Sequence, residues 1–184
     1  MSGINRAIYE DCFFKAYRND SSNQKCVFIS HKKEDEAAAE SVANYIMYDL
    51  NMDVYLDKND GQLRDAVSKG DKQKIVASIQ KGISCSDYLI CVMSEKTKLS
   101  WWVPYEIGYM EKRNQEKKEA KSNIASFMTK DVSAVPEFLE IKEILRNRID
   151  LKRFLNVTNN RYRLNERYDR GDTTYYFTMG RYFD

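Results

Sequence analysis

Histidine is nearly absent from this sequence. His31 is the only imidazole among 184 residues, so a catalytic triad or a multi-histidine metal site has no second histidine to draw on. Most hydrolase and metalloenzyme chemistries are disfavoured on that ground. A Walker loop and the G-x-G-x-x-G fingerprint are also missing, which argues against a dinucleotide held in the Rossmann manner.

Long apolar runs and paired cysteine motifs are missing as well. No stretch of 18 apolar residues and no secretory signal pattern occurs, so we expect neither a membrane span nor a signal peptide. The four cysteines show no C-x-x-C spacing, and Cys26 and Cys91 fall inside apolar runs. These features predict reduced thiols in a cytoplasmic protein, in place of a disulfide framework or a zinc site.

The charge is balanced and the length suits one domain. Lys and Arg total 30 against 28 Asp and Glu, which leaves a net charge of +2, and 42% of the residues are hydrophobic. A chain of this size buries a substantial core. The charge balance favours neither a nucleic-acid partner nor an acidic tail.

Strand-length apolar runs alternate with helical periodicity along the chain. The runs expected to be strands are Cys26–Ile29, Met52–Asp57, Tyr88–Met93 and Ile124–Met128. The expected helices are about Glu36–Leu50 with Asp35 as N-cap, about Asp71–Ser84, Val103 onward, and one long helix from Pro136 towards Phe154. A loop is expected over Lys58–Gly70. This alternation predicts an α/β fold with a doubly wound parallel sheet.

The two ends of the chain depart from this pattern. Residues 1–25 form a leader with a short amphipathic helix around Ala7 to Tyr17, which we interpret as a packing or oligomerisation element. Residues 156–184 interleave tyrosines with arginines, a pattern that can bind single-stranded nucleic acid, but three aspartates dilute the charge. An edge strand or interface arm fits that segment better. The predicted domain is 26–155, between these extensions.

The stretch from Ser100 to Glu111 is the most informative for function. Val103, Ile107 and Met110 recur at helical spacing, and Trp102, Glu106 and Tyr109 form a second stripe beside them. Glu106 is therefore expected at the rim of the packed face, between aromatic side chains. The alternative is that Glu106 is a solvated helix residue and the tryptophans are packing anchors.

Polar residues follow three of the predicted strands. Ser30-His31, Asp57-Lys58 and Ser94-Glu95 each come directly after an apolar run, and Glu106 begins its helix shortly after the third pair. Ligands of open parallel sheets bind beyond the carboxyl ends of the strands. The sequence thus predicts hydroxyl, carboxylate and aromatic groups on one rim of the sheet.

These residues resemble a known family. The Phe-Ile-Ser-His opening at 28–31, the acid at Asp35, the segment from Asp57 to Gly70 and the Ser-x-Trp-x-x-x-Glu pattern of 100–106 resemble the TIR domain, especially its bacterial members. The resemblance covers about 26–154. It implies a flavodoxin-like three-layer fold with a five-stranded parallel sheet and a site at the predicted rim.

The resemblance also implies an activity. Many bacterial TIR proteins cleave the nicotinamide–ribose bond of NAD+, and the family's essential glutamate corresponds to Glu106. NAD+ is then a substrate, and no permanently bound cofactor is expected. A small TIR protein of this size is similar to the TIR component of Thoeris anti-phage systems, which makes an ADP-ribose-derived signal for a separate effector. Association with other TIR subunits is also implied.

The chemistry suits the residues. Cleavage leaves an oxocarbenium-like ribosyl cation while nicotinamide departs neutral, so one carboxylate can stabilise the cation without a general acid. Trp102 and Tyr105 are candidates to stack on nicotinamide or adenine.

Ser30 and His31 are candidates to line the ribose and phosphate region, and Lys32 or Lys33 to offset the charge of the pyrophosphate. Asp57 is a further substrate-binding candidate, because the resemblance implies that the loop beginning at Asp57 and Lys58 packs against a neighbouring subunit and completes the site. Ser30 and His31 each have an alternative without a ligand: Ser30 also fits a turn residue, and His31 also fits a partly exposed loop histidine.

Two other functions fit the sequence. A TIR scaffold would bind other TIR domains without catalysis, and an enzyme like the nucleoside deoxyribosyltransferases would also use a glutamate on a ribosyl carbon. The presence of Glu106 favours catalysis over the scaffold, and the combined motifs argue against the transferase. The acceptor, and with it the choice between ADP-ribose, a cyclic isomer and a conjugate, is left open.

Overall fold

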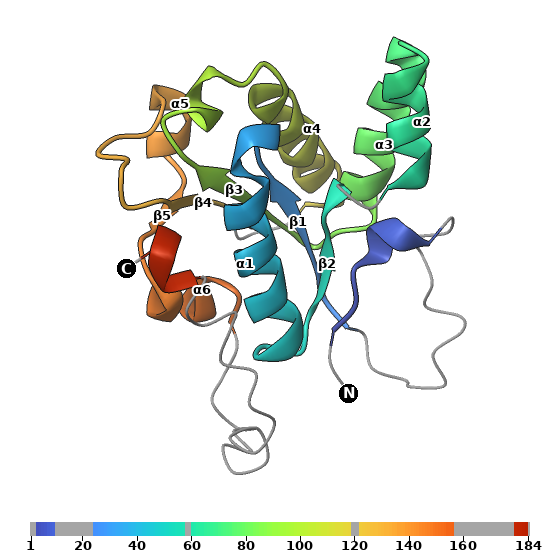
Figure 1. Cartoon of the computed structure of the whole chain (residues 1–184). Helices are drawn as coiled ribbons and strands as arrows, with labels where there is room; N and C mark the ends of the chain where they lie inside the picture. The colour runs from blue at the N-terminus through green and yellow to red at the C-terminus, as the bar shows by residue number, and fades with distance from the viewer. Residues whose placement is uncertain (1–2, 10–23, 58–59, 119–121, 157–178, 184) are drawn as a thin grey trace.

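A single parallel sheet forms the centre of the molecule (Figure 1). The computed structural model describes residues 3–9, 24–57, 60–118, 122–156 and 179–183, and the elements named here lie within these ranges. The strands run in the order β2-β1-β3-β4-β5, which is the order of flavodoxin-like folds. They are β1 (Cys26–Ser30), β2 (Asp53–Tyr55), β3 (Tyr88–Met93), β4 (Ile124–Met128) and β5 (Glu143–Leu145). The predicted fold class is confirmed.

Helices cover both faces of the sheet and make the fold three-layered. The helices are α1 (Glu36–Tyr48), α2 (Gly61–Ser68), α3 (Lys72–Ser84), α4 (Trp102–Lys117), α5 (Glu137–Glu140) and α6 (Arg148–Phe154). Three short 3-10 turns are η1 (Arg6–Ile8), η2 (Lys33–Asp35) and η4 (Thr97–Leu99). One hydrophobic cluster joins the strands to α1 and α6, and a second joins them to α3, α4 and α5.

The strands alternate strictly between these two clusters. Val27 and Ile29 belong to the α1 side, whereas Cys26 and Phe28 belong to the α4 side. All five residues of β1 are buried, as expected for a strand covered on both faces. Ser30 therefore projects from the last position of β1 towards the α4 side.

The expected long helix from Pro136 to Phe154 is wrong. The structure breaks it into α5, the edge strand β5 and α6, and β5 pairs with β4. The apolar residues at helical spacing suggested one buried helix face, but they do not form one, because Ile141 and Ile149 are 80% and 69% exposed. A new helix begins after Asn147, because its side chain accepts hydrogen bonds from the amides of Ile149 and Asp150 and caps α6.

Two local expectations also needed correction, and one was confirmed. Asp35 precedes α1 but makes no side-chain cap, since its carboxylate binds elsewhere. The predicted loop of 58–70 contains α2, capped by Asp60, while 58–59 lie outside the described residues. The expected helix from about Asp71 to Ser84 is confirmed as α3, and the Asp71 side chain caps it.

The extensions are described only in part. In the leader, η1 occupies Arg6–Ile8, and the rest of the expected helix lies outside the described residues. Most of the aromatic-rich segment of 156–184 is likewise outside them. Within 179–183, Phe183 is buried and stacks on Phe127 of β4, with ring centroids 4.2 Å apart. This end of the chain therefore contributes to the α1-side core.

The cysteine expectation holds only in part. Cys26 and Cys91 are free and buried, but Cys85 is disulfide-bonded. Sequence spacing does not reveal such a bond, because pairing depends on which chain segments the fold brings within reach. Among the described residues, no helix combines the length and apolar character needed to cross a bilayer.

Candidate active site

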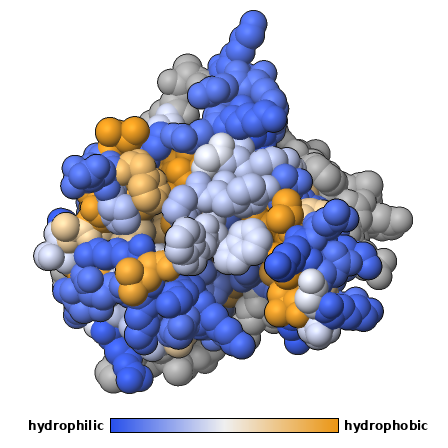
Figure 2. Space-filling model, turned by 90° about the horizontal axis from the view of Figure 1, so that it is seen from above, coloured by the Kyte–Doolittle hydropathy of each residue, from blue (hydrophilic) through white to orange (hydrophobic). Residues whose placement is uncertain are grey.

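The carboxyl ends of β1 and β3 define the candidate site. These strands are neighbours, but the chain leaves β1 for α1 on one face and β3 for α4 on the other. Such a reversal in strand order opens a crevice above the sheet, and ligands of open α/β sheets bind there. Figure 2 views the molecule from above, where hydrophilic side chains surround smaller apolar patches.

Glu106 lies in the first turns of α4 and points into this region. Glu106 is only 6% exposed, and the Ser30 hydroxyl donates a hydrogen bond to its Oε2 atom. Val103, Ile107 and Met110 pack α4 against the sheet and thereby fix the helix that carries Glu106. The carboxylate is thus more deeply buried than the rim position that helical spacing predicted. The solvated-helix interpretation of Glu106 does not fit this burial.

Burial sets the proton affinity of Glu106. Desolvation raises the pKa of its carboxyl from 4.5 to about 7, the Ser30 hydrogen bond acts in the opposite direction, and the negative charge of Asp57 adds to the rise. Glu106 therefore changes charge near neutral pH. A carboxyl of this kind suits catalysis because both protonation states are accessible.

Cys91 lies beside Ser30 and Glu106 and was not singled out from the sequence. It pairs with Ser30 in the parallel register of β1 and β3, and its pKa is raised by burial first and by the charge of Glu106 second. The thiol stays neutral and inert under these conditions. Cys91 in turn pairs with Ser126 of β4, whose hydroxyl has no hydrogen-bond partner among the described residues.

His31 and Asp57 lie at the ends of β1 and β2. The His31 Nδ1 atom is 3.9 Å from Asp57 Oδ1 and 3.3 Å from the Ile29 carbonyl oxygen. The His31 side chain is only 5% exposed, so it does not behave as the exposed loop histidine that the sequence also allowed. The structure thus brings Ser30, His31, Asp57 and Glu106 to one end of neighbouring strands.

Lys32 pairs with a residue outside this group. Its Nζ atom lies 3.3 Å from Glu34 Oε1 on the turn leading into α1, and its side chain is 32% exposed.

The aromatic residues that precede Glu106 differ sharply in environment. Trp102 is 43% exposed and packs edge-on against Tyr105, with ring centroids 6.0 Å apart. The Tyr105 hydroxyl accepts a hydrogen bond of 2.7 Å from Gln80 of α3. Trp101, by contrast, is 94% exposed. Trp102 and Tyr105 therefore form an aromatic pair of which Trp102 remains exposed to solvent.

Asp35 organises a second polar cluster on the same end of the sheet. It accepts hydrogen bonds from Ser94 and from Thr97, the latter at 2.7 Å, so it ties the loop after β1 to the loop after β3. Sequence reasoning assigned it to helix capping because the partner loop is far away in the chain. A pocket of about 330 Å³ adjoins it, lined by Glu34, Asp35, Ala37, Ala38, Ser94, Lys96, Asp131 and Tyr182.

The described part of the chain offers no grouping of three or more metal-ligating side chains. What the arrangement provides is one buried carboxyl that titrates near neutrality, a hydroxyl bonded to it and an aromatic pair just before it in α4. These groups can hold a carboxylate beside a polar ligand and stabilise positive charge that develops there.

The comparisons with known proteins agree with this architecture. The family model described as TIR domain matches residues 27–162, about three quarters of the chain. The match begins in β1 and includes every strand and the whole of α4. No curated protein matches the sequence.

Proposed function

This chain belongs to the TIR domain family, and on that basis we propose that it is an enzyme that cleaves the nicotinamide–ribose bond of NAD+. The observation that carries the proposal is the burial of Glu106 beside the Ser30 hydroxyl, with a pKa of about 7. A structural glutamate gains nothing from such burial, because desolvating a carboxyl costs free energy. A carboxyl pKa that burial raises in this way is characteristic of functional sites.

The proposed reaction needs one carboxylate. The bond between the ribose C1′ and the nicotinamide nitrogen breaks, and its electron pair leaves with nicotinamide, which becomes neutral. The ionised Glu106 lies beside the resulting oxocarbenium-like ribose and stabilises its positive charge. An acceptor oxygen then bonds to C1′ and loses its proton, giving ADP-ribose with water, or a cyclic isomer with a hydroxyl of the same molecule.

The other predicted residues have supporting roles. Trp102 and Tyr105 present an aromatic face on which nicotinamide or adenine stacks. His31 and Asp57 lie where the ribose hydroxyls would be bound, and Lys32 offsets the charge of the pyrophosphate. We further propose that the product is a nucleotide signal of bacterial antiviral defence, made by assembled subunits and sensed by a separate effector.

A direct experiment is to incubate NAD+ with concentrated protein and with extracts of phage-infected cells that express it, and to follow substrate and products by mass spectrometry. The informative variant is Glu106→Gln, and Glu116→Gln is the matched control on the exposed end of the same helix. We expect NAD+ loss with the wild type and the control, and a decrease of about 100-fold or more with Glu106→Gln. Equal turnover by both variants would falsify the proposal.

A second candidate function is a TIR scaffold without catalysis. The observation that favours it is the exposure of Leu99 and Trp101, at 74% and 94%, next to the site. Large apolar side chains of this kind are typical of binding surfaces. The scaffold predicts intact NAD+ with every variant and loss of cellular function after Trp101→Ala, while Glu106→Gln retains that function.

A further inference from the structure

Residues 3–9 lie along the outer edge of β2, outside the stretch matched by the TIR family. The Val54 amide donates to the Ile4 carbonyl at 2.9 Å, and Asn5 forms a parallel bridge with Val54. A Cβ atom at Gly3 would stand 1.8 Å from the Met52 carbonyl oxygen, so only glycine permits this close approach. The segment thus covers a sheet edge that would otherwise offer unpaired amides and carbonyls.

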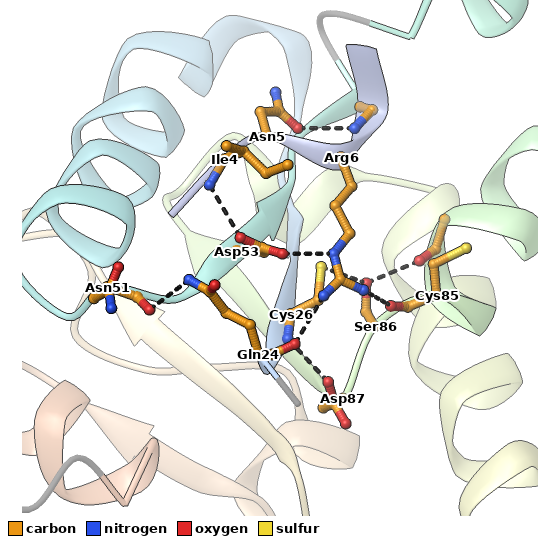
Figure 3. A network of polar contacts seen from close by, with 12 residues as sticks. Ile4, Asn5, Arg6, Gln24, Cys26, Asn51, Asp53, Cys85, Ser86 and Asp87 are labelled. Atoms are coloured by element: carbon orange, nitrogen blue, oxygen red, sulfur yellow. Dashed lines mark hydrogen bonds and ion pairs between the residues drawn. The ribbon is translucent and has the colours of Figure 1, made fainter. Parts of the chain in front are cut away.

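Arg6 anchors this segment at the amino end of β2 (Figure 3). It is only 6% exposed, and its Nε atom donates to Asp53 Oδ2 at 2.9 Å. The remaining guanidinium nitrogens donate to the carbonyls of Cys85 and Gln24, at 3.1 and 2.8 Å. One side chain therefore links the segment to β2, to the end of α3 and to the residue that leads into β1.

Asn5 acts at the opposite end of β2. Its Nδ2 atom donates to the Leu56 carbonyl at 3.2 Å, and its Oδ1 atom accepts from the Leu56 amide at 3.1 Å. Oδ1 also accepts from the Ala7 amide at 3.1 Å, which fixes the Asn5 rotamer. The Asn5 side chain thus gives the amide and the carbonyl of Leu56 the partners that a neighbouring strand would otherwise supply.

Leu56 needs this partner because β2 is the edge strand of the sheet: the peptide groups of Leu56 face away from β1, as those of Val54 do, and the main-chain bridge to the leader is at Val54. The residue after Leu56 is Asp57, whose carboxylate lies 3.9 Å from His31 and acts electrostatically on Glu106. We propose that Asn5 is a positioning residue: by holding both peptide groups of Leu56, it fixes where Asp57 lies relative to His31 and to bound substrate. The kinetic consequence rests on the proposed function, whereas the structural consequence does not.

The single histidine provides a readout that is independent of catalysis. Only His31 contributes imidazole C–H resonances to the proton spectrum, and a carboxylate 3.9 Å away affects their position. The variants are Asn5→Ala, which removes both bonds, and Asn5→Asp, which keeps the acceptor but faces the Leu56 carbonyl with a second oxygen. The matched control is Gln24→Ala, which removes an amide bond of 2.7 Å to the Asn51 carbonyl at the other end of β2.

Both Asn5 variants are expected to shift the His31 resonances, with circular dichroism unchanged, and Gln24→Ala is expected to leave them in place. With NAD+ as substrate, KM rises about three- to tenfold in Asn5→Ala, the value of one or two hydrogen bonds, and kcat changes less than about twofold. Unshifted resonances in both folded Asn5 variants overturn the inference, as does an unchanged KM. If the wild type leaves NAD+ intact, the proposed function fails and the resonances alone decide the role of Asn5.

Discussion

The Ser30 hydroxyl donates its hydrogen bond to the Oε2 atom of Glu106, across the boundary between β1 and α4. Burial favours the neutral acid, while this bond favours the carboxylate, so the two effects oppose each other at one atom. The charge of Asp57, at the end of β2, acts on the Glu106 carboxyl, and the charge of Glu106 in turn helps to raise the pKa of Cys91 on β3. The proton affinity of Glu106 is therefore set jointly by its burial, by Ser30 and by Asp57.

The pH profile of catalysis follows from this balance. Because the ionised carboxylate stabilises the ribosyl cation, kcat/KM of the wild type should rise with a midpoint near pH 7. Ser30→Ala removes the bond that favours ionisation, so the midpoint should move upward by about 1 pH unit or more. Ser30→Thr keeps a hydroxyl and should retain the wild-type midpoint. A midpoint that is the same in all three proteins would show that Ser30 does not influence Glu106.

Stability should also depend on the charge of Glu106. Below pH 4.5 the group is protonated in both the folded and the unfolded chain, whereas above pH 7 the folded protein must bury a carboxylate. The stabilising contribution of the neutral form is therefore present at low pH and lost as pH rises through 7. Glu106→Gln is neutral throughout, so its unfolding free energy should exceed that of the wild type by about 3 kcal/mol at pH 8.5 and by little near pH 4.5.

Urea denaturation of the two proteins at both pH values measures this difference. Glu116→Gln is again the control, since that side chain is exposed and pairs only loosely with Lys112, at 3.9 Å. A constant gap between Glu106→Gln and wild type at the two pH values would contradict the raised pKa. The same measurement separates the effect of burial from any effect of substrate.

Trp102 and Trp101 should differ in their effects on substrate binding. Trp102 packs on Tyr105 and is 43% exposed, so Trp102→Ala should raise KM for NAD+ by about fivefold or more, the value of one base stacked on an aromatic ring. Trp101→Ala should leave KM unchanged, because that indole is 94% exposed. Steady-state kinetics of both variants tests the assignment. A larger effect at Trp101 would place the binding face on the neighbouring indole.

How far the sequence predicts this molecule depends on the range of the interactions involved. Strands β1 to β4 and the long helices α1, α3 and α4 could be predicted, because apolar runs and helical spacing are local signals. The edge strand β5 could not, since it has only three residues, of which Leu145 alone is buried, and so carries no strand signal. Its identity comes from pairing with β4, an interaction that only the folded sheet supplies.

The candidate site divides in the same way. Glu106 could be found from the motif around it, and Ser30 and Asp57 from their places after predicted strands. Asn5 and Cys91 could not, because each acts through neighbours in the folded sheet that are far away in the chain. The burial of Glu106 also escaped prediction, since helical spacing gives its direction but not the depth of the residues that pack around it.

The ion pair between Arg6 and Asp53 should dominate the stability of the leader. Both side chains are nearly inaccessible, at 7% and 5% exposure, so Arg6→Met leaves the Asp53 carboxylate buried without its cation. Removing one partner of a buried pair typically costs about 3 to 5 kcal/mol, and we expect a loss in this range. The exposed pair of Lys69 and Asp65 provides the control, because Lys69→Met should cost less than about 1 kcal/mol.

Arg6→Met combined with Asp53→Leu should recover most of that loss, since apolar replacement of a whole buried pair is often neutral. Urea unfolding of the single and double variants measures the coupling between the two residues. The recovery will be incomplete, because Asp53 also accepts from the Ile4 amide at 3.1 Å. If Arg6→Met cost no more than Lys69→Met, the ion pair would contribute little to stability, and the leader would be held at the edge of β2 by its main-chain bonds and by Asn5.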